Sequence, residues 1–319
     1  MAKNKFKILI VGFGTVGKGF FDLFYEKRDL LKLGNVEISE IIDSAYGHII
    51  DPNPKDPLPL KTAASEQNLS VTKLIKNSDA DLVCEFTWVN YTTAEPALSH
   101  IMAALHSGKH VVTTNKGPMA LHFGSIMETA RIHERLFKFK GTVMSGTPSF
   151  DLMDLIPGAK IKSVRGIMNG TTNFILSRIR EGKDFDSALK EAQKLGYAEN
   201  DPTNDIDGLD AAAKITIISK LLGWGHEFGD VERTGIRNVS TEEAKRGTKL
   251  IAYADKDKIY VKPTEVSDDI LKDVNGTDNA IQFDTDTLGR ITMIGPGAGK
   301  RETAQAAISD LVNILRISR

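Results

Sequence analysis

The chain has 319 residues and a formal net charge of −1 at pH 7, with 41% hydrophobic and 26% charged residues. This length is enough for two domains of ordinary size, and the composition is that of a globular protein. The small net charge gives no electrostatic reason to expect nucleic acid or an anionic membrane as a partner, and no apolar run is long enough to span a bilayer. The single cysteine, Cys84, excludes an internal disulfide and favours a reducing compartment such as the cytoplasm.

The first predicted element is a buried parallel strand from Phe6 to Val11, a short apolar run. A helical stretch to about Leu33 follows it, and between the two stand six residues, Gly12, Phe13, Gly14, Thr15, Val16 and Gly17. In this context the first glycine makes a turn, the second admits a pyrophosphate, and the third lets the helix pack on the strand. We therefore expect residues 12–17 to bind a dinucleotide in a Rossmann domain. The alternative is a glycine turn that binds nothing.

A second strand, Val36 to Ile42, is followed by Asp43. An acid about 20 residues beyond the glycine turn contacts the ribose 2′-hydroxyl in dinucleotide-binding domains. A carboxylate there favours NAD because it repels the 2′-phosphate of NADP. Nearby lysines could still reach such a phosphate, so the cofactor is NAD or NADP. The alternative for Asp43 is a loop cap.

Two further strands of the first domain are predicted at 80–86 and 110–113. Thr87 follows the first and Lys116 follows the second, at the carboxyl ends of strands, where doubly wound sheets bind ligands. We expect both residues to border the cofactor crevice, although Lys116 taken alone reads as a surface lysine. A strand over 137–143 completes this part of the prediction.

Beyond residue 149 the pattern changes, beginning with strand-like alternation over 162–168. A polar turn over 169–173, which contains Gly170 and Thr171, precedes a helix predicted over 174–181. Its amides and hydroxyls can receive an anion such as a substrate carboxylate, or the turn simply caps the helix.

Strands at 258–262, 280–284 and 290–294 indicate a mixed or antiparallel sheet. Gly297 then lies in a glycine-rich turn before a last helix, so we expect the chain to return there to the cofactor crevice. The fold class predicted is α/β, with an N-terminal dinucleotide-binding domain and an α+β domain with a mixed sheet. The first domain is expected to comprise residues 1–148 with 293–319 returning, and the second residues 149–292.

The most distinctive stretch is an acidic loop that leads into a helix bearing Lys214. Asp210 precedes Lys214 by one helical turn and can pair with it. Ile217 and Ile218 place the lysine on or beside the apolar face of the helix, where it needs a carboxylate partner. An EF-hand calcium loop fails because Lys214 would occupy its last ligand position. A loop of carboxylates facing a lysine suits binding a small zwitterion and moving a proton, whereas the alternative is a solvated acidic loop.

Taken together, the chain resembles homoserine dehydrogenase over nearly its whole length, through the motifs GFGTVG, NKGPMAL, MNGTTNFIL, GYAENDPTNDIDGLDAAAK and IGPGAGKRETAQAAISDLV. The resemblance implies a homodimer that interconverts L-homoserine and L-aspartate 4-semialdehyde with NAD or NADP, in threonine and methionine biosynthesis. It also implies that the second domain is catalytic and dimerises. By position, the substrate-site residues would be Tyr197, Glu199, Asp205 and Asp210, and the active-site lysines Lys116 and Lys214.

Charge suggests a mechanism for such a reaction. The acids would hold the substrate ammonium, and the amides from Asn169 to Thr172, which include Gly170 and Thr171, its carboxylate. Lys214 would donate the proton during reduction, and Lys116 would polarise or relay, although the sequence does not decide between the two lysines.

Three alternatives remain at this point. Aspartate-semialdehyde dehydrogenase needs a reactive thiolate, and Cys84 lies inside a predicted strand. Another amino-acid or hydroxy-acid dehydrogenase would use the same cofactor domain. A non-catalytic NAD-sensing dimer would have no need of a proton donor.

Two features suggest differences from longer or metal-dependent relatives. The chain ends after the last predicted helix, so we expect a short form without an appended regulatory domain and with little allosteric inhibition by threonine. In the family a sodium ion is held by main-chain carbonyls, here those of Val143, Ser145 and Thr147. Lys140 stands where the family has an acid, so we expect no metal at this turn.

Overall fold

The computed structural model describes residues 5–58, 70–267 and 269–318, which form two compact units. The first unit contains residues 1–142 and 299–319, and the second contains Val143–Ala298. The chain passes from one unit to the other at residues 142–143 and 298–299, a few residues from the expected boundaries of 148 and 293. The last strand of the second unit continues to Pro296, and this places residues 293–296 with the second sheet.

The first unit is a doubly wound α/β layer around a six-stranded sheet in the order β3-β2-β1-β4-β5-β6. All neighbours pair in parallel except β2 and β3, which are antiparallel. The elements are β1 (Phe6–Val11), α1 (Thr15–Lys27), β2 (Val36–Asp43), β3 (Gly47–Ile50), α2 (Val71–Asn77), β4 (Leu82–Glu85), α3 (Ala97–His106), β5 (His110–Thr113), α4 (Lys116–Ile132), β6 (Phe137–Lys138), η1 (Lys140–Thr142) and α11 (Lys300–Ile317). The order reverses between β1 and β4, which is the point where such sheets bind ligands.

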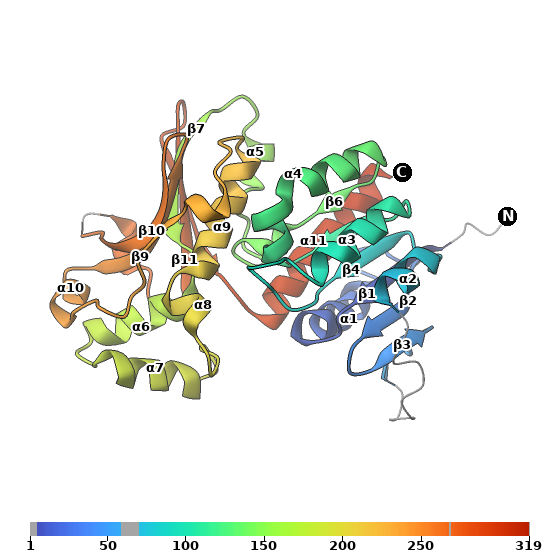
Figure 1. The fold of residues 1–319 in the computed structure, drawn as a ribbon, viewed down its shortest axis with the longest axis horizontal. Helices are drawn as coiled ribbons and strands as arrows, with labels where there is room; N and C mark the ends of the chain where they lie inside the picture. The colour runs from blue at the N-terminus through green and yellow to red at the C-terminus, as the bar shows by residue number, and fades with distance from the viewer. Residues whose placement is uncertain (1–4, 59–69, 268, 319) are drawn as a thin grey trace. The chain divides into compact units, whose positions relative to one another are not determined.

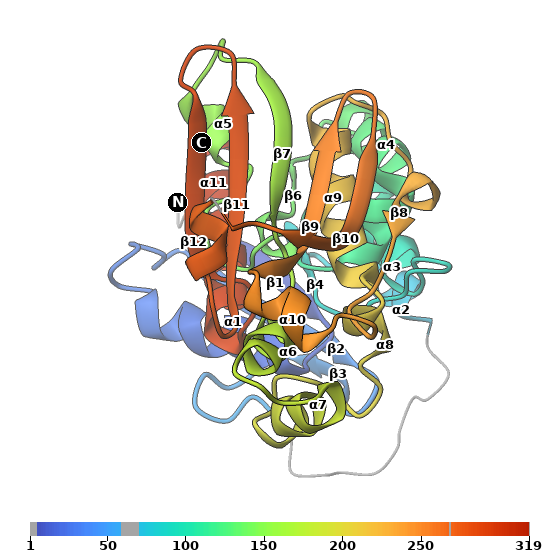
Figure 2. The ribbon, with the colours of Figure 1, turned by 90° about the vertical axis from the view of Figure 1, so that its left-hand side faces the viewer.

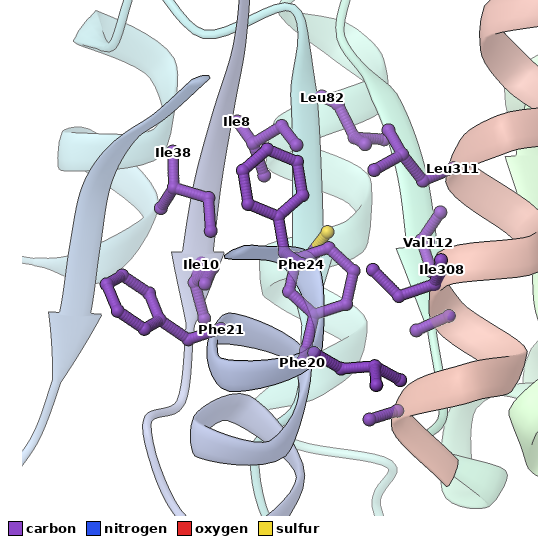
Figure 3. Packing of buried hydrophobic residues seen from close by; sticks show 14 of the residues in the cluster. Ile8, Ile10, Phe20, Phe21, Phe24, Ile38, Leu82, Val112, Ile308 and Leu311 are labelled. Carbon is purple, nitrogen blue, oxygen red and sulfur yellow. The ribbon is translucent and has the colours of Figure 1, made fainter. Parts of the chain in front are cut away.

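The core of the first unit lies between this sheet and helices α1 and α11 (Figure 3). Phe20, Phe21 and Phe24 come from α1, and Ile308 and Leu311 come from α11. Each of these side chains is almost fully buried and contributes about 2 kcal/mol through removal of apolar surface from water. Figure 1 shows α11 beside α1, so the last helix of the chain completes a core that the first helix begins.

The second unit is an α+β layer around a mixed sheet in the order β12-β11-β7-β9-β10-β8. Among the described residues of this sheet only β8 and β10 pair in parallel, and Figure 2 shows the hairpins β11–β12 and β9–β10 on either side of β7. The elements are α5 (Leu152–Leu155), β7 (Ile161–Ile167), α6 (Gly170–Arg180), α7 (Phe185–Lys194), α8 (Thr203–Ile206), α9 (Leu209–Leu221), η2 (Phe228–Asp230), β8 (Glu232–Arg233), α10 (Thr241–Lys245), β9 (Thr248–Asp255), β10 (Ile259–Glu265), η3 (Ile270–Asp273), β11 (Asp278–Thr285) and β12 (Arg290–Pro296). The α/β fold class with a mixed second sheet is therefore confirmed.

Three predicted elements are corrected by the structure, and the first of them is helix α1, which was expected to reach about Leu33 but ends at Lys27. The strand expected over 137–143 pairs only at Phe137–Lys138, because the chain then turns into η1. The main-chain amide of Lys140 donates to the buried carboxylate of Asp310, 2.8 Å away, and this fixes the turn. The helix expected from residue 174 begins at Gly170, so the polar turn forms its first turn.

No helix in the described part of the chain combines the length and apolar character that crossing a membrane requires.

Candidate functional site

The glycine turn after β1 has the close packing that the motif predicts. Gly12 has φ +90°, and a Cβ there would lie 2.8 Å from backbone atoms of Phe86 and Thr87. A Cβ on Gly17 would lie 2.2 Å from the carbonyl oxygen of Gly12, whereas a Cβ on Gly14 would meet no atom within 4 Å. The first and third glycines are thus required by packing, and the second faces open space at the start of α1. This arrangement fits a pyrophosphate, which binds main-chain amides at a helix N-terminus.

Asp43 reaches back to this turn from the end of β2. Its Oδ2 accepts a hydrogen bond from the main-chain amide of Phe13 at 2.7 Å, and its Oδ1 accepts one from Ala45 at 2.8 Å. The ring of Phe13 is buried in the core, so only its backbone can face a cofactor. Thr15 is exposed and Val16 half-buried at the start of α1. Asp43 is therefore beside the turn, as a ribose-binding acid must be.

Lys116 is the first residue of α4 and is half-buried. Asn115 caps this helix by accepting from the amide of Gly117 at 3.1 Å. Its side-chain nitrogen donates to the carbonyls of Thr87 at 3.1 Å and Trp88 at 3.0 Å. Thr87 and Lys116, at the ends of β4 and β5, are thus joined through Asn115.

In the second unit, Lys214 is buried on α9, with 6% of its surface exposed. Its Nζ lies 2.7 Å from Oδ2 of Asp210 and donates to the main-chain carbonyl of Met168 at 2.6 Å. Nδ2 of Asn169 lies 2.6 Å from Oδ1 of Asp205 and 3.0 Å from Oδ2 of Asp210. One lysine, two carboxylates and one amide therefore form a connected cluster where β7 leads into α6.

The two carboxylates of this cluster interact electrostatically. Burial, and then the charge of Asp210, raise the pKa of the Asp205 carboxyl above its usual value, while Asn169 and Lys214 act in the opposite direction. Carboxylates that are crowded in this way gain stability from a bound cation. The cluster is thus suited to an ammonium group.

The other expected substrate residues lie around α6, and the structure does not bring all of them into the cluster. Thr171 donates from its hydroxyl to the carbonyl of Tyr197 at 2.6 Å, and the Tyr197 ring meets Phe174 edge-on at 5.0 Å between centroids. Gly170 opens the helix, where a Cβ would lie 2.5 Å from a main-chain oxygen. Glu199 is exposed, and the contact found among the described residues is through its carbonyl, not its carboxylate.

Gly297 has a packing role within the second unit. A Cβ at this position would lie 2.0 Å from the side-chain amide of the buried Asn279. A Cβ here would therefore force the Asn279 side chain to move, whether or not the turn contacts a cofactor.

The turn at the start of the second unit is strained. Met144 and Ser145 have φ of 53° and 52°, in the left-handed region that non-glycine residues seldom adopt. The carbonyl of Val143 accepts from the hydroxyl of Ser149 at 3.3 Å, and that of Met144 accepts from the amide of Thr147 at 3.0 Å.

Two polar groups of these sites were not identified from the sequence, the Met168 carbonyl and the side chain of Asn115, and Asn169 was identified only as part of a turn that can cap the helix. Each asparagine stands directly before a helix and after or near the end of a strand, which is a recognisable signal for a cap. The Met168 carbonyl has no sequence signal, because any residue would supply it.

Comparison with known proteins gives the same result in both units. A family model described as homoserine dehydrogenase matches residues 148–312, and one described as homoserine dehydrogenase, NAD binding domain, matches residues 12–140. Homoserine dehydrogenase of Sulfurisphaera tokodaii is 41% identical over 97% of this chain and 99% of its own length. The NAD(+)-dependent homoserine dehydrogenase of Pseudomonas canavaninivorans is 36% identical over 98% and 96%.

Solved structures agree with these relatives. A hyperthermophilic archaeal homoserine dehydrogenase in complex with NADPH superposes with a TM-score of 0.85 at 32% identity, covering 98% of each chain. Matches of this extent, with the glycine turn and the lysine–acid cluster in place, show that the chain belongs to the homoserine dehydrogenase family.

Proposed function

We propose that this protein interconverts L-homoserine and L-aspartate 4-semialdehyde, with homoserine bound at the Lys214 cluster and NAD or NADP bound at the glycine turn. The observation that carries the proposal is the buried Lys214, held between the Asp210 carboxylate and the Met168 carbonyl with Asn169 bridging to Asp205. A dinucleotide supplies the hydride acceptor or donor when bound. The residues of the chain then have to bind the substrate and move one proton.

Recognition follows from charge. Homoserine carries an ammonium, a carboxylate and a hydroxyl. The paired carboxylates of Asp205 and Asp210 suit the ammonium, with Tyr197 and Glu199 contributing from the adjoining loop. The amides at Gly170 and Thr171 open α6 and suit the substrate carboxylate.

Lys214 is proposed as the proton donor for reduction and the acceptor for oxidation. Three rotatable N–H bonds on a rigidly held ammonium let it keep its two partners and still donate to the substrate oxygen. Its charge also stabilises the alkoxide that develops when hydride arrives. Lys116 is proposed to polarise or relay.

A thiol-based reaction is disfavoured by Cys84. This residue is fully buried within β4, and burial raises the pKa of its thiol well above the usual value. A thiolate that could form a thioester is therefore not supplied by Cys84.

We further propose that the unit of residues 1–142 and 299–319 is the functional cofactor domain and that Val143–Ala298 form a catalytic domain that dimerises. A homodimer in the cytoplasm, in the branch that leads to threonine and methionine, is the setting that the family resemblance supports.

The direct test is cofactor reduction by purified protein. L-Homoserine with NAD or NADP should give reduced cofactor, whereas a panel of other amino acids and hydroxy acids should not. Light scattering of the same sample tests the dimer. Activity with another panel member that exceeds activity with homoserine would overturn the substrate assignment.

A further inference from the structure

Glu85, the last residue of β4, is a fully buried acid that the mechanism above does not use. Its Oε1 accepts from the main-chain amide of Thr87 at 3.1 Å and also from the Thr87 hydroxyl. Its Oε2 lies 3.3 Å from the hydroxyl of Thr113, and Nδ1 of His100 lies 3.5 Å from Oε1. A carboxylate taken wholly out of water is costly unless its surroundings compensate it.

These contacts place Glu85 at the base of the two loops that follow β4 and β5. The Thr113 hydroxyl accepts from the amide of Asn115 at 3.0 Å, and Asn115 in turn bonds to Thr87 and caps the helix that starts with Lys116. Thr87 also lies against the glycine turn, because a Cβ on Gly12 would be 2.8 Å from its nitrogen. One carboxylate therefore organises the loops beside the switch point of the sheet.

Hydrogen bonding alone does not require a charge at this position. A neutral glutamine would keep an acceptor oxygen for Thr87, so these contacts alone do not explain why an acid stands here. The oxidised nicotinamide ring carries a positive charge and the reduced ring does not. A fixed negative charge inside a poorly screened environment therefore favours the oxidised form over the reduced form.

We propose that Glu85 is a positioning residue for the Thr87 and Lys116 loops and that its buried charge favours binding of oxidised over reduced cofactor. The inference rests on the proposed function, since it concerns the same cofactor site. It assigns a role in setting the redox preference of the bound cofactor to a residue whose side chain is held by Thr87, Thr113 and His100.

The chain contains a matched control in the same sheet. Glu40 in β2 is also a buried acid, with 7% exposure, and is also paired with a histidine and a hydroxyl. His48 Nε2 lies 2.7 Å from it, and Ser78 donates to it. Glu40 lies within its strand and does not hold the loops at the carboxyl ends of β4 and β5.

The test measures the dissociation constants of NAD+ and NADH without turnover, by calorimetry and by NADH fluorescence. For Glu85→Gln the ratio of the NAD+ constant to the NADH constant should rise roughly fivefold or more, the effect of losing one poorly screened charge. Glu40→Gln should leave the ratio unchanged, and Glu85→Asp, which keeps the carboxylate, should have a ratio close to that of the wild-type protein. The proposal would be overturned if Glu85→Gln raised both dissociation constants by the same factor, or if its only effect were a lower melting temperature.

A second variant covers the case in which Glu85→Gln does not fold. His100→Lys places a fixed positive charge next to the carboxylate and should raise the same ratio without removing Glu85. An unchanged ratio in folded His100→Lys would also overturn the proposal. Failure of the proposed function is distinguishable, because the wild-type protein would then show no turnover of homoserine with either cofactor.

Discussion

The glycine turn of the first unit and the lysine–acid cluster of the second unit are proposed to recognise ligands by opposite means. The turn works through missing side chains: at Gly12 and Gly17 a Cβ would collide with backbone, and at Gly14 it would enter open space. The cluster presents ionisable side chains that are nearly buried, with Lys214 6% and Asp210 9% exposed. One site is defined by shape and the other by charge, so we expect substitutions at the two sites to have different effects on turnover, cofactor binding and stability.

The largest expected effect is on chemistry, in the charge-defined site. Lys214→Met keeps the apolar stem and removes the proton, so kcat should fall at least about 100-fold, while NAD(P)H affinity hardly changes. Lys220→Met is the matched control, because Lys220 lies on the same helix and pairs with Glu227 at 2.5 Å. Steady-state rates and cofactor titrations check this. Near-normal turnover of Lys214→Met would remove Lys214 from the mechanism.

The next effect separates packing from ligand space within the glycine turn. Gly14→Ala should fold with little loss of stability but bind NAD(P)H about tenfold or more weakly, because its methyl group occupies the space for the pyrophosphate. Gly17→Ala should also lose about 1–3 kcal/mol of unfolding free energy, because its methyl meets the Gly12 carbonyl. Thermal melts with fluorescence titrations distinguish the two. Equal destabilisation by both variants would contradict the division of roles.

A smaller effect concerns Asp43, an acidic side chain beside the glycine turn. Asp43→Ala should shift the ratio of kcat/KM from NAD toward NADP several-fold, because the repulsion of a 2′-phosphate is removed. Lys18, whose Nζ donates to the Tyr46 hydroxyl at 3.1 Å, then supplies a cation one turn along α1. Adding Lys18→Met to Asp43→Ala should cancel part of the gain. If the ratio does not change in the single variant, Asp43 only closes its loop.

The smallest effect is on stability and arises in the cluster. Folding raises the pKa of Asp205 above its ordinary value of 3.8, so the folded state binds this proton more readily than the unfolded state does. Ionised Asp205 therefore destabilises the folded state in full at neutral pH. This cost in unfolding free energy is relieved as the pH falls through the folded pKa of Asp205. Asp205→Asn should raise the melting temperature at pH 7 by about 2–4 °C, with a difference that vanishes near the ordinary pKa, and should weaken homoserine binding. A lower melting temperature at pH 7 would show that Asp205 stabilises the fold.

The sequence was most informative where local chemistry determines structure. The first strand was predicted at Phe6–Val11 and is found there, because an apolar run before a glycine turn has few other solutions. The Asp210–Lys214 pair follows from helical spacing alone. The Met168 carbonyl could not be predicted, because it is brought to Lys214 by tertiary packing across 46 positions.

The central strand β9 was missed for a similar reason. Lys249 lies within it and is 2% exposed, where a charged residue normally argues against a core strand. Its ammonium is accommodated by distant acceptors, the Val274 carbonyl at 2.6 Å and the side chains of Asn173 and Asn275, and burial lowers its pKa to about 8. Only the assembled fold reveals these partners.

The return of α11 to the first unit has a consequence for how the chain folds during synthesis. Ion pairs at 2.8 Å join Lys300 to Asp22 and Arg301 to Glu26, and Ile308, Leu311 and Ile314 complete the core begun by α1. A ribosome therefore releases the second unit, which is continuous in sequence, before it supplies the helix that closes the first. Until α11 has been synthesised, the apolar face of α1 in the nascent first unit stays partly uncovered. We therefore expect chaperones to bind the first unit rather than the second.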